Sequence, residues 1–407
     1  MIYRELKELL ERHNQLQVLK WWDELDAAGR QKLAGQIERV DWSLLPLVKG
    51  HAVFPKGKVE PIDGLDLAAI AEGRERFRAL GLEALRAGKL ACVLLAGGQG
   101  TRLGSDAPKG TFDIGITKPL FIFEQLIRNL QEVVRACGVT VPLFIMTSEE
   151  NDAQTQDFFR AHDYFGYPAQ AVAFFRQEMA PVVGLDGKLL LSAKDSLALS
   201  PNGNGGWYSS LVRAGLAEEA EKRGVTWYNV IAVDNVLQRM ADPVFLGATM
   251  ESGRATGAKF VRKACPEERV GVLCLEDGRP GVIEYYEIGK ELSELRDEAG
   301  RLVYSFGVTL NYLFRADVLR TISAARLPVH VAKKKVLCLD EEGNLVEPQT
   351  ENGCKFETLI LDMIRCAGSC LPFEVEREKE FAPIKNRTGV DSVDTARELL
   401  RKNGVEL

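Results

Sequence analysis

The feature of this 407-residue sequence that most constrains its fold is an apolar run that leads directly into a glycine-rich segment. Leu90–Leu95 (LACVLL) is short and continuously apolar, which is typical of a strand buried on both faces of a sheet. Leu95–Gly110 follows, with four glycines packed into Gly97–Gly104, and then the helical stretch Pro119–Cys137. Strand, glycine-rich loop and helix in this order predict an α/β sheet that binds a ligand at the carboxyl ends of its strands.

The glycine-rich segment has the composition of a phosphate site. Glycine lets a ligand approach the main chain closely, and the N–H groups of such a loop can hold phosphate oxygens. Arg102 and Lys109 add two cations that could stabilise a polyphosphate and its leaving group. The P-loop pattern is absent, and Gly98, Gly100 and Gly104 do not have dinucleotide-binding spacing. A tight turn without a ligand is the plainer alternative, and the coincidence of glycines, cations and strand favours the phosphate site.

The rest of the chain predicts an α/β fold with added parts. Strand-like runs at Val141–Met146, Ala171–Phe175 and Trp227–Val233 alternate with helical stretches at Asp152–Ala161 and Gly206–Arg223, which predicts a mostly parallel sheet. Three short β-rich runs then predict a meander. We expect an N-terminal helical region at 1–88, a catalytic domain at 89–330 and a C-terminal region at 331–407. The meander runs are Val270–Leu275, Gly281–Tyr286 and Leu302–Val308.

Charge and hydropathy narrow the class of protein. The chain carries 52 basic and 58 acidic side chains, so it lacks the overall positive charge of a nucleic-acid-binding protein. It has no apolar run of about 18 residues, and the segment after Arg4 is too charged for a secretory signal, so we expect a cytoplasmic protein without a membrane partner. Cys366 and Cys370 are about one helical turn apart. Half-buried thiols on one helix face are favoured there over a metal or redox pair.

Several blocks of the sequence resemble one enzyme family. LAGGQGTRLG, followed by Pro108-Lys109-Gly110, is similar to the eukaryotic-type UDP-sugar pyrophosphorylases, and among them to the UDP-N-acetylhexosamine pyrophosphorylases. The resemblance implies a Rossmann-like, mixed but mostly parallel sheet of the sugar nucleotidyltransferase type, with a small N-terminal helical part and a small C-terminal α+β part. It also implies a uridylyltransferase that joins UTP to a sugar-1-phosphate and releases pyrophosphate. Further blocks in family order are FFRQEMAPV at 174–182, SPNGNGGWY at 200–208, VDNVLQRMADP at 233–243, NGCK at 352–355 and FAPIKN at 381–386.

The resemblance assigns UTP-binding roles to individual positions. Gln177 would read the uracil edge, because its amide offers a donor and an acceptor. Gly203 would let the uracil approach the backbone. Asp234 would bind Mg²⁺, although a turn or N-cap aspartate is an equal alternative on sequence alone. Arg102 and Lys109 would act on the leaving group. The uridine would lie against Leu95, Ala96, Gly97 and Gly98, and Lys355 would contact phosphate.

The sugar-binding positions match the family less completely. Asn204, Gly271, Glu284 and Tyr285 match positions that contact the sugar, and Lys385 matches a lysine that contacts its phosphate. The family usually has an asparagine where this chain has Val308, and aromatic residues where it has Leu359 and Leu361. N-acetylglucosamine-1-phosphate nevertheless remains the first choice of substrate. Glucose-1-phosphate and galactose-1-phosphate are the alternatives.

Two other classes of protein remain for comparison. An NAD(P)-dependent oxidoreductase would need an acidic residue at the end of the next strand, about 20 residues after the glycines. Here that position falls within a helical stretch that contains Glu124, so this class is disfavoured. A non-catalytic nucleotide-sugar sensor would lack the cations or Asp234, and all of these are present. The sequence leaves open whether the protein is a monomer or a homodimer.

Overall fold

The computed structural model describes residues 2–48 and 57–407, and the chain forms two compact units. Each unit takes three stretches of sequence, so the chain passes from one unit to the other five times. These units cut across the sequence-based regions 1–88, 89–330 and 331–407, because contacts between distant stretches define them. The small unit contains Met1–Pro55, Glu178–Gly206 and Leu327–Ile360, and the large unit contains Lys56–Gln177, Trp207–Arg326 and Leu361–Leu407.

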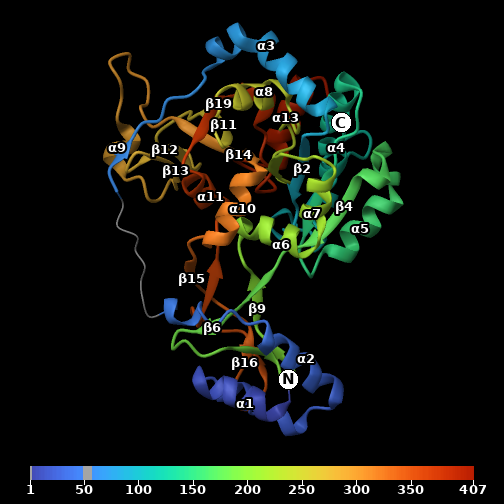
Figure 1. Cartoon of the computed structure of the whole chain (residues 1–407), viewed down its shortest axis with the longest axis vertical. Helices are drawn as coiled ribbons and strands as arrows, with labels where there is room; N and C mark the ends of the chain where they lie inside the picture. The colour runs from blue at the N-terminus through green and yellow to red at the C-terminus, as the bar shows by residue number, and fades with distance from the viewer. Residues whose placement is uncertain (1, 49–56) are drawn as a thin grey trace. The chain divides into compact units, whose positions relative to one another are not determined.

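A ten-stranded mixed sheet forms the centre of the large unit (Figure 1). Its strands are β1 (Val59–Glu60), β2 (Leu90–Leu95), β3 (Leu143–Thr147), β4 (Val172–Arg176), β10 (Trp227–Ala232), β11 (Thr256–Arg262), β12 (Val272–Glu276), β13 (Arg279–Ile283), β14 (Phe306–Arg315) and β19 (Cys370–Glu374). The order is β1-β12-β14-β10-β2-β3-β4. From β10 to β4 the neighbours are parallel, as the strand–helix alternation predicts. β14 pairs antiparallel with β10 and β11, so the predicted mixed Rossmann-like sheet is confirmed.

The antiparallel half of the sheet differs from the prediction in extent and register. The predicted strand Leu302–Val308 begins only at Phe306 and continues to Arg315 as β14. Its second half contains the buried Asn311, which accepts a hydrogen bond from Asn229 Nδ2 at 2.8 Å and hides the strand pattern in the sequence. The predicted strand Gly281–Tyr286 ends at Ile283, so the turn after β13 carries Glu284 and Tyr285.

Helices cover the sheet, and α4 (Ile122–Cys137) and α5 (Asp152–Ala161) lie within the predicted helical stretches Pro119–Cys137 and Asp152–Ala161. The predicted helix Gly206–Arg223 is an exception, because Gly215 adopts a left-handed conformation (φ 76°) and divides it into two helices. The helices of the large unit are α3 (Leu67–Arg86), α4 (Ile122–Cys137), α5 (Asp152–Ala161), α6 (Trp207–Arg213), α7 (Leu216–Lys222), α8 (Pro243–Glu251), α9 (Lys290–Glu294), α10 (Ala316–Ala325), α12 (Arg377–Glu380) and α13 (Val393–Lys402). α11 (Ile360–Ala367) begins at the last residue of the small unit.

Helices α3 and α8 cross with their backbones in contact. A Cβ placed on Gly81 would overlap the carbonyl of Pro243, and a Cβ placed on Gly247 would overlap the carbonyl of Phe77. Each helix therefore requires glycine where it meets the other. The main hydrophobic core, which includes residues of both helices, extends beneath them to the central strands.

The small unit has its own core, built from all three of its stretches. Its helices are α1 (Tyr3–Arg12) and α2 (Ala27–Glu38), and a three-stranded sheet consists of β15 (His330–Lys334), β18 (Gly353–Glu357) and β6 (Val183–Gly184). A hairpin pairs β16 (Cys338–Leu339) with β17 (Leu345–Val346), and its turn includes residues 342–344. The fully buried Leu6, Leu33 and Ile37 pack in one cluster with Val183 and Phe356. The other strand pairs of this unit are β5 (Met179–Pro181) with β9 (Leu199–Pro201), and β7 (Leu191–Ala193) with β8 (Ser196–Leu197).

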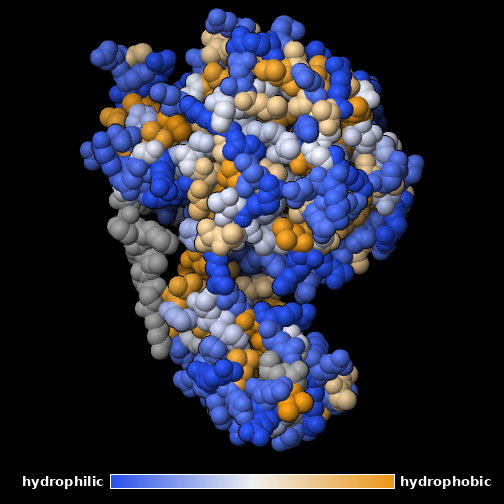
Figure 2. Space-filling view, in the orientation of Figure 1, coloured by the Kyte–Doolittle hydropathy of each residue, from blue (hydrophilic) through white to orange (hydrophobic). Residues whose placement is uncertain are grey.

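The surface agrees with the composition. Hydrophilic side chains dominate the face of each unit that Figure 2 shows, with apolar residues scattered among them. None of the helices described is both long enough and apolar enough to cross a membrane. The eight cysteines are all free thiols, and Cys366 is exposed on α11 whereas Cys370 is buried at the start of β19. These two residues do not share one helix.

Candidate active site

The glycine-rich loop folds back on itself at the carboxyl end of β2. Ala96 N donates to Met146 O at 2.8 Å, which extends the pairing of β2 with β3 by one residue. Lys109 N then donates to Gly98 O at 3.1 Å, so the two ends of the loop lie against each other. Within the loop, Gly104 adopts φ 77° at the end of the short helix that carries Arg102. The fold thus brings Lys109 beside the predicted phosphate-binding backbone at Gly98.

Asn151 fixes the position of this loop, and the sequence patterns did not indicate it. Its fully buried side chain donates from Nδ2 to Ala96 O at 3.0 Å and, more weakly, to Gly98 O at 3.4 Å. Ser148 N donates to Asn151 Oδ1 at 2.8 Å. Carbonyls that point away from a ligand need such partners when they are buried. The only local signal was an amide side chain just beyond the end of a predicted strand.

Gln177 lies where the resemblance predicts a reader of the base. It directly follows β4, and its N–H donates to Thr147 O at 2.8 Å. A Cβ placed on Gly97 would lie 3.3 Å from Gln177 Oε1, so the carboxamide faces the first glycine of the loop. Any side chain at Gly97 would press on this carboxamide. Gly97 and Gln177 therefore form one surface at the carboxyl edge of the sheet.

Asp234 lies at the same edge, directly after β10. Val233 N donates to Leu95 O at 3.1 Å, which holds the end of β10 level with the start of the glycine-rich loop. Asp234 O accepts a hydrogen bond from Ile384 N at 2.8 Å. The side chain is half-buried. This backbone contact places the segment that contains Lys385 beside Asp234.

Asn235 links the same two segments and was not predicted. Its buried carboxamide accepts from Ala382 N at 2.9 Å and donates to Glu380 O at 2.8 Å. The partners are more than 140 positions away in the sequence, so local patterns could not reveal this role. Asn235 therefore holds segment 380–384, and Lys385 after it, against the end of β10.

Lys109 stands within electrostatic reach of three other predicted site residues. Burial is the main reason that the pKa of Lys109 lies below the usual lysine value, and repulsion by Lys385 and Arg102 lowers it further. The Asp234 carboxylate opposes this shift. The structure thus brings two further cations and one carboxylate within electrostatic reach of Lys109, as expected for a polyphosphate site.

Two further residues contact this group and were not predicted. Lys385 Nζ lies 3.1 Å from Asp391 Oδ2, and Lys385 N donates to Asp391 O at 2.7 Å, so Asp391 positions this lysine. Arg387, two residues beyond Lys385, approaches the glycine-rich loop. A Cβ placed on Gly104 would lie 3.3 Å from Arg387 Nη1. Arg387 is therefore a candidate fourth cation.

Three of the sugar-related positions lie together. A Cβ placed on Gly271 would lie 3.4 Å from Val308 Cγ2 and 3.8 Å from Glu284 Oε2. Burial and the neighbouring Glu287 raise the pKa of Glu284, and Lys385 opposes that shift. Lys385 therefore lies within electrostatic reach of both Lys109 and Glu284. It joins the phosphate-binding and sugar-binding groups.

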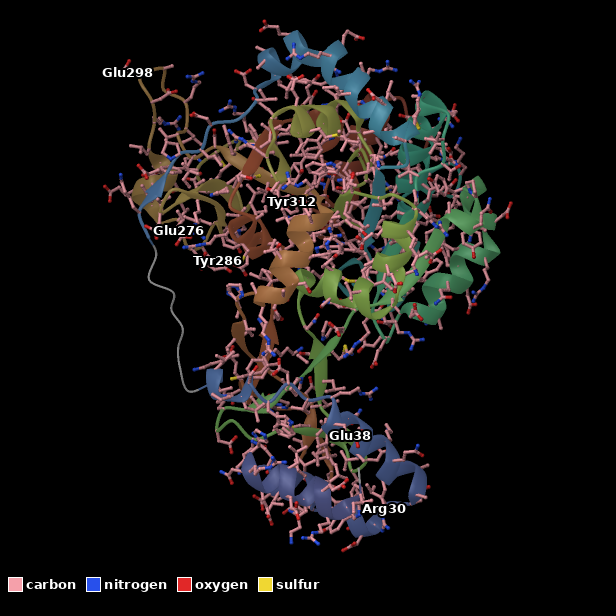
Figure 3. All side chains as sticks on the ribbon, in the orientation of Figure 1. Arg30, Glu38, Glu276, Tyr286, Glu298 and Tyr312 are labelled. Carbon is pink, nitrogen blue, oxygen red and sulfur yellow. The ribbon has the colours of Figure 1, made fainter. Side chains whose placement is uncertain are left out.

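The predicted Tyr285 lies more openly than the other sugar residues. Its side chain is 41% exposed and packs edge-to-face with Tyr286 at a centroid distance of 5.2 Å. Figure 3 shows Tyr286 at the edge of the large unit, in contrast to the buried Tyr312. No measured contact links Tyr285 to Glu284 beyond their adjacency in the turn after β13.

The remaining predicted residues, Gly203, Asn204 and Lys355, belong to the small unit. Gly203 has φ 86°, and a Cβ there would overlap the backbone of Thr358, so packing within this unit already requires the glycine. Asn204 Oδ1 accepts from Ile360 N at 2.9 Å, which uses this oxygen at the start of α11. Lys355 is half-buried on β18, opposite Ala332 of β15.

The sequence as a whole matches one known family. Residues 58–395 match the family described as UTP–glucose-1-phosphate uridylyltransferase. The chain belongs to this uridylyltransferase family. The human UDP-N-acetylhexosamine pyrophosphorylase-like protein 1 is 37% identical over 98% of this chain and 83% of its own length. The UDP-N-acetylglucosamine pyrophosphorylase of Saccharomyces cerevisiae is 34% identical over 97% of this chain and 88% of its own length.

Solved structures of the uridylyltransferase family share the fold. The UDP-N-acetylglucosamine pyrophosphorylase of Trypanosoma brucei, determined with an inhibitor, has a TM-score of 0.82 and 28% identity over 98% of this chain and 84% of its own. A UDP-N-acetylglucosamine pyrophosphorylase structure from Entamoeba histolytica has a TM-score of 0.76 and 32% identity over 85% of this chain and 88% of its own. The protein is a nucleotidyltransferase of the UDP-sugar pyrophosphorylase type, and both the resemblance and the predicted fold class are confirmed.

The geometry suits nucleotidyl transfer and gives the expected Mg²⁺ one carboxylate. Among the described residues, no group of three or more histidine, cysteine, aspartate or glutamate side chains could enclose a metal ion. Magnesium does not need such a cage, because it is often held by one or two carboxylates together with substrate phosphates. The single carboxylate of Asp234, which lies within electrostatic reach of Lys109, is compatible with that mode. A uridylyltransferase-family enzyme would use it in this way.

Proposed function

We propose that this protein forms UDP-N-acetylglucosamine and pyrophosphate from UTP and N-acetylglucosamine-1-phosphate. The observation that carries the proposal is the grouping of Arg102, Lys385 and Asp234 within electrostatic reach of Lys109, with Glu284 within reach of Lys385. Relatives that are 34–37% identical carry names of UDP-N-acetylhexosamine or UDP-N-acetylglucosamine pyrophosphorylases. This supports a sugar-1-phosphate as the second substrate, and N-acetylglucosamine as its sugar.

The reaction is an in-line displacement at phosphorus. An oxygen of the sugar-1-phosphate forms a bond to the α-phosphorus of UTP, and the bond from that phosphorus to the bridging oxygen of pyrophosphate breaks. The attacking phosphate is ionised near neutral pH, so no general base is required. Catalysis then consists of positioning and charge stabilisation. Lys385, which adjoins both Lys109 and Glu284, is placed to hold the sugar phosphate against the α-phosphorus.

The UTP-binding residues divide the remaining work. The backbone at Gly97 and Gly98 and the carboxamide of Gln177 would hold the uridine, and Arg102 and Lys109 would stabilise the leaving pyrophosphate. Asp234 would hold Mg²⁺, which when bound supplies further neutralisation of phosphate charge. Gly203, Asn204 and Lys355 keep, as proposals, the uracil, sugar and phosphate contacts that the family resemblance implies. We also keep a cytoplasmic location as a prediction.

The sugar is the least constrained part of the proposal. Val308 places an apolar side chain beside Gly271 and Glu284, where the family usually has asparagine. Leu359 and Leu361 are half-buried aliphatic residues in place of the family's aromatics. Glucose-1-phosphate and galactose-1-phosphate are therefore the second candidates, since they share the hydroxyls that Glu284 can accept from.

A pyrophosphate-release assay tests the proposal directly. The enzyme is supplied with UTP and each of the three sugar-1-phosphates, and ATP, CTP and dTTP replace UTP as controls. Release is expected with UTP and highest with N-acetylglucosamine-1-phosphate, and Lys109→Ala should lower it about 100-fold or more. Preferred use of glucose-1-phosphate would move the assignment to that sugar. Absence of release with every pair would support a non-catalytic sensor.

A further inference from the structure

A second pocket lies in the large unit, and none of the proposed substrate-binding residues lines it. Its volume is about 500 Å³, within the range of roughly 300–1,000 Å³ that is typical of small-molecule sites. Its lining includes the exposed Arg74 and Arg78 of α3 together with Gln125 and Asn129 of α4. The lining also includes Arg239 from the loop after β10.

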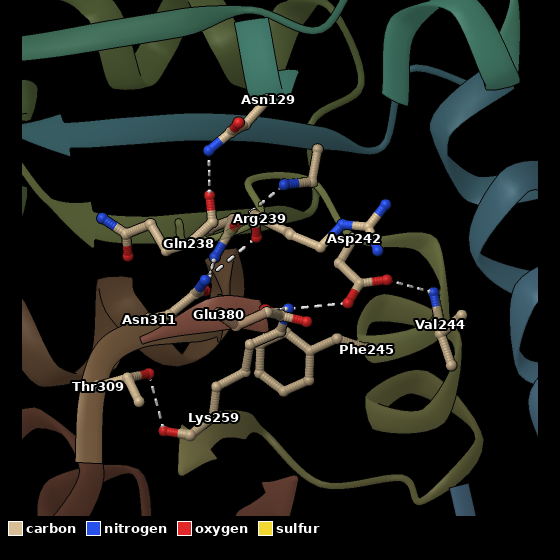
Figure 4. Close-up of polar contacts among 12 residues, drawn as sticks. Asn129, Gln238, Arg239, Asp242, Val244, Phe245, Lys259, Thr309, Asn311 and Glu380 are labelled. Carbon is tan, nitrogen blue, oxygen red and sulfur yellow. Dashed lines mark hydrogen bonds and ion pairs between the residues drawn. The ribbon is translucent and has the colours of Figure 1, made fainter. Parts of the chain in front are cut away.

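The acidic groups of this pocket are largely neutralised within the protein. Buried Lys259 contacts Asp242 Oδ2 at 2.8 Å and Glu380 Oε2 at 2.6 Å (Figure 4). Burial is the largest influence on both carboxyls and raises the pKa of Glu380, whereas Lys259 and Arg239 help to lower the pKa of Asp242 despite its burial. Two more lining carboxylates form ion pairs, Glu374 with Arg262 at 3.2 Å and Glu376 with Lys379 at 2.9 Å. These carboxylates therefore do not repel an incoming anion as free charges would.

Two arginines remain without partners. Arg74 and Arg78 are one helical turn apart on the pocket face of α3, and neither guanidinium pairs with any residue in the described parts of the chain. Among the carboxylates that line the pocket, Glu132 is the one that also lacks a partner in the described parts of the chain. Two guanidinium groups at this spacing are suited to phosphate, which accepts paired hydrogen bonds from each. The free charge of the pocket therefore favours a phosphorylated ligand.

A buried amide on α4 lacks one hydrogen bond. The side chain of Gln125 is only 4% exposed, and its Nε2 donates to Asn129 Oδ1 at 2.8 Å. Its Oε1 finds no partner among the described residues, which is costly for a buried acceptor. This oxygen has almost no accessible area, so a ligand hydroxyl would satisfy it only after a small movement of the side chains that cover it. Phosphate-binding arginines on α3 and an unsatisfied amide oxygen on α4 match a phosphorylated sugar.

Hydrogen bonds connect the pocket walls to the segments that carry Asp234 and Lys385. Asn129 Nδ2 donates to Val236 O and Gln238 O, both at 3.0 Å, and these residues lie on the loop that begins with Asp234. Glu380, which lines the pocket, begins the segment that Asn235 holds and that ends at Lys385. A ligand that moves Asn129 or Glu380 therefore acts through these hydrogen bonds on the loop that carries Asp234 and on the segment that carries Lys385.

We propose that this pocket is a second binding site, for a small phosphorylated sugar, and that its occupancy alters the affinity or turnover of the active site. The two sites then interact reciprocally, since a coupling free energy acts in both directions. The inference does not depend on which sugar the active site uses.

Isothermal titration with glucose 6-phosphate as the probe tests the binding. The titration is run with and without saturating UDP-N-acetylglucosamine, so that a site separate from the nucleotide-sugar site can be recognised. We expect binding under both conditions, weakened about tenfold or more by Arg78→Glu, since a charge-assisted contact contributes roughly 1.5–3 kcal/mol. Arg39→Glu, a charge reversal on the exposed end of α2, is the matched control and should leave binding unchanged.

Two further measurements separate the parts of the proposal. Gln125→Met should weaken glucose 6-phosphate but not inorganic phosphate, because only the sugar offers a hydroxyl to Gln125. Glucose 6-phosphate should also change kcat/KM for UTP in the wild type but not in Arg78→Glu, whose activity without the probe should be normal.

Several results would overturn the proposal. Loss of binding in the presence of saturating UDP-N-acetylglucosamine would assign the probe to the active site. Equal binding by Arg78→Glu and Arg39→Glu would assign it to no defined site. No binding by the wild type at about 10 mM, a Kd too weak to matter, would remove the second site altogether. Inorganic phosphate binding as tightly as glucose 6-phosphate would reject the sugar. Binding without any kinetic effect would reject the coupling.

Discussion

Lys109 gives the active site a pH dependence that an exposed lysine would not. Burial, together with Lys385 and Arg102, lowers the pKa of Lys109, so this ammonium loses its proton at a lower pH than an ordinary lysine. Only the charged form attracts phosphate. We therefore expect kcat/KM for UTP to fall as the pH rises through this lowered pKa. The measurement is a pH–rate profile at low UTP, which reports groups of the free enzyme.

A variant at the same position separates Lys109 from other groups that titrate. Lys109→Arg keeps its charge at all accessible pH values, so its profile should be flat on the alkaline side even where its activity is lower. Lys118→Arg, at an exposed lysine paired with Glu406, should keep the wild-type profile. An unaltered alkaline fall in Lys109→Arg would mean that another group controls it.

Arg387 is the site residue whose contribution was least expected. Its guanidinium lies beside Gly104, at the end of the turn that carries Arg102. We expect Arg387→Ala to raise the KM for UTP and for pyrophosphate by about threefold to tenfold, the loss of one exposed charge-assisted contact. KM for the sugar-1-phosphate should hardly change. Steady-state kinetics in both directions measures this.

The control for Arg387 is an arginine of similar exposure elsewhere in the C-terminal segment. Arg401→Ala, on the last turn of α13, should leave all kinetic constants unchanged. An equal rise in KM for all substrates in Arg387→Ala would contradict a role specific to the leaving group.

The site residues show how far sequence can predict chemistry. Gln177 and Asp234 came from family resemblance, and the structure places both at the carboxyl edge of the sheet. Asn151 and Asn235 were missed because each binds the backbone of a segment far away in the sequence, whereas Asp391, only six positions from Lys385, carries no motif of its own. The roles of the two asparagines depend on which segments meet in space, and a single sequence does not contain that information.

At the scale of elements, the loop after β10 and segment 380–385 depend on the side chain of Asn235. Asn235→Leu preserves the approximate shape of the side chain but leaves Ala382 N and Glu380 O without their partner. Each unsatisfied buried group costs about 1–3 kcal/mol, so we expect a lower Tm. We also expect a lower kcat, because Asp234 and Lys385 would no longer be held in position relative to each other. Thermal denaturation and steady-state kinetics measure the two effects.

A graded variant strengthens this test. Asn235→Asp retains the acceptor for Ala382 N and loses only the donor to Glu380 O, so it should lie between the wild type and Asn235→Leu in both Tm and kcat. If Asn235→Leu lost stability but kept full kcat, the link would be structural only.

The crossing of α3 and α8 makes a separate prediction about helix packing. A methyl group at Gly247 would overlap the carbonyl of Phe77, so Gly247→Ala must separate the two helices. Overpacking of this kind costs about 1–3 kcal/mol or more. Gly35→Ala is the matched control, because Gly35 lies inside α2 with open space around it. There the same change should stabilise the protein by about 0.4–1 kcal/mol.

Opposite signs for these two substitutions in urea denaturation would confirm the packing argument. A neutral effect of Gly247→Ala would show that the helices can move apart without loss. This crossing also shows which structural features a sequence pattern does not predict. The crossing of α3 with α8 was not predictable from the sequence, and the true extent of β14 was hidden by buried polar residues such as Asn311.

At the scale of the whole molecule, the small unit should respond to mutation as one body. Leu33 is fully buried in α2, in a core shared with Val183 and Phe356 from the other two stretches. Leu33→Ala removes part of this core at a cost of about 2–5 kcal/mol. We expect faster amide exchange in all three stretches, and unchanged exchange in β2 and β3 of the large unit. Hydrogen exchange with mass spectrometry resolves these segments.

Leu130→Ala is the matched control in the large unit, since Leu130 is fully buried on α4. It should accelerate exchange around the central sheet and leave α1 and α2 unchanged. Faster exchange in Leu33→Ala that was confined to residues 2–48 would contradict a shared core. Changes in sequence pattern along the chain suggested boundaries at 88 and 330. The small unit is instead defined by contacts between stretches more than 100 residues apart.

The link between Asp234 and segment 380–385 also has a consequence for synthesis on the ribosome. The ribosome synthesises β2 and the glycine-rich loop early. It adds Lys385, and the Asp391 that positions this lysine, hundreds of codons later. A nascent or prematurely terminated chain can therefore possess the nucleotide-binding loop without the group that aligns its second substrate. Truncated products should be inert, and they should not consume UTP in side reactions.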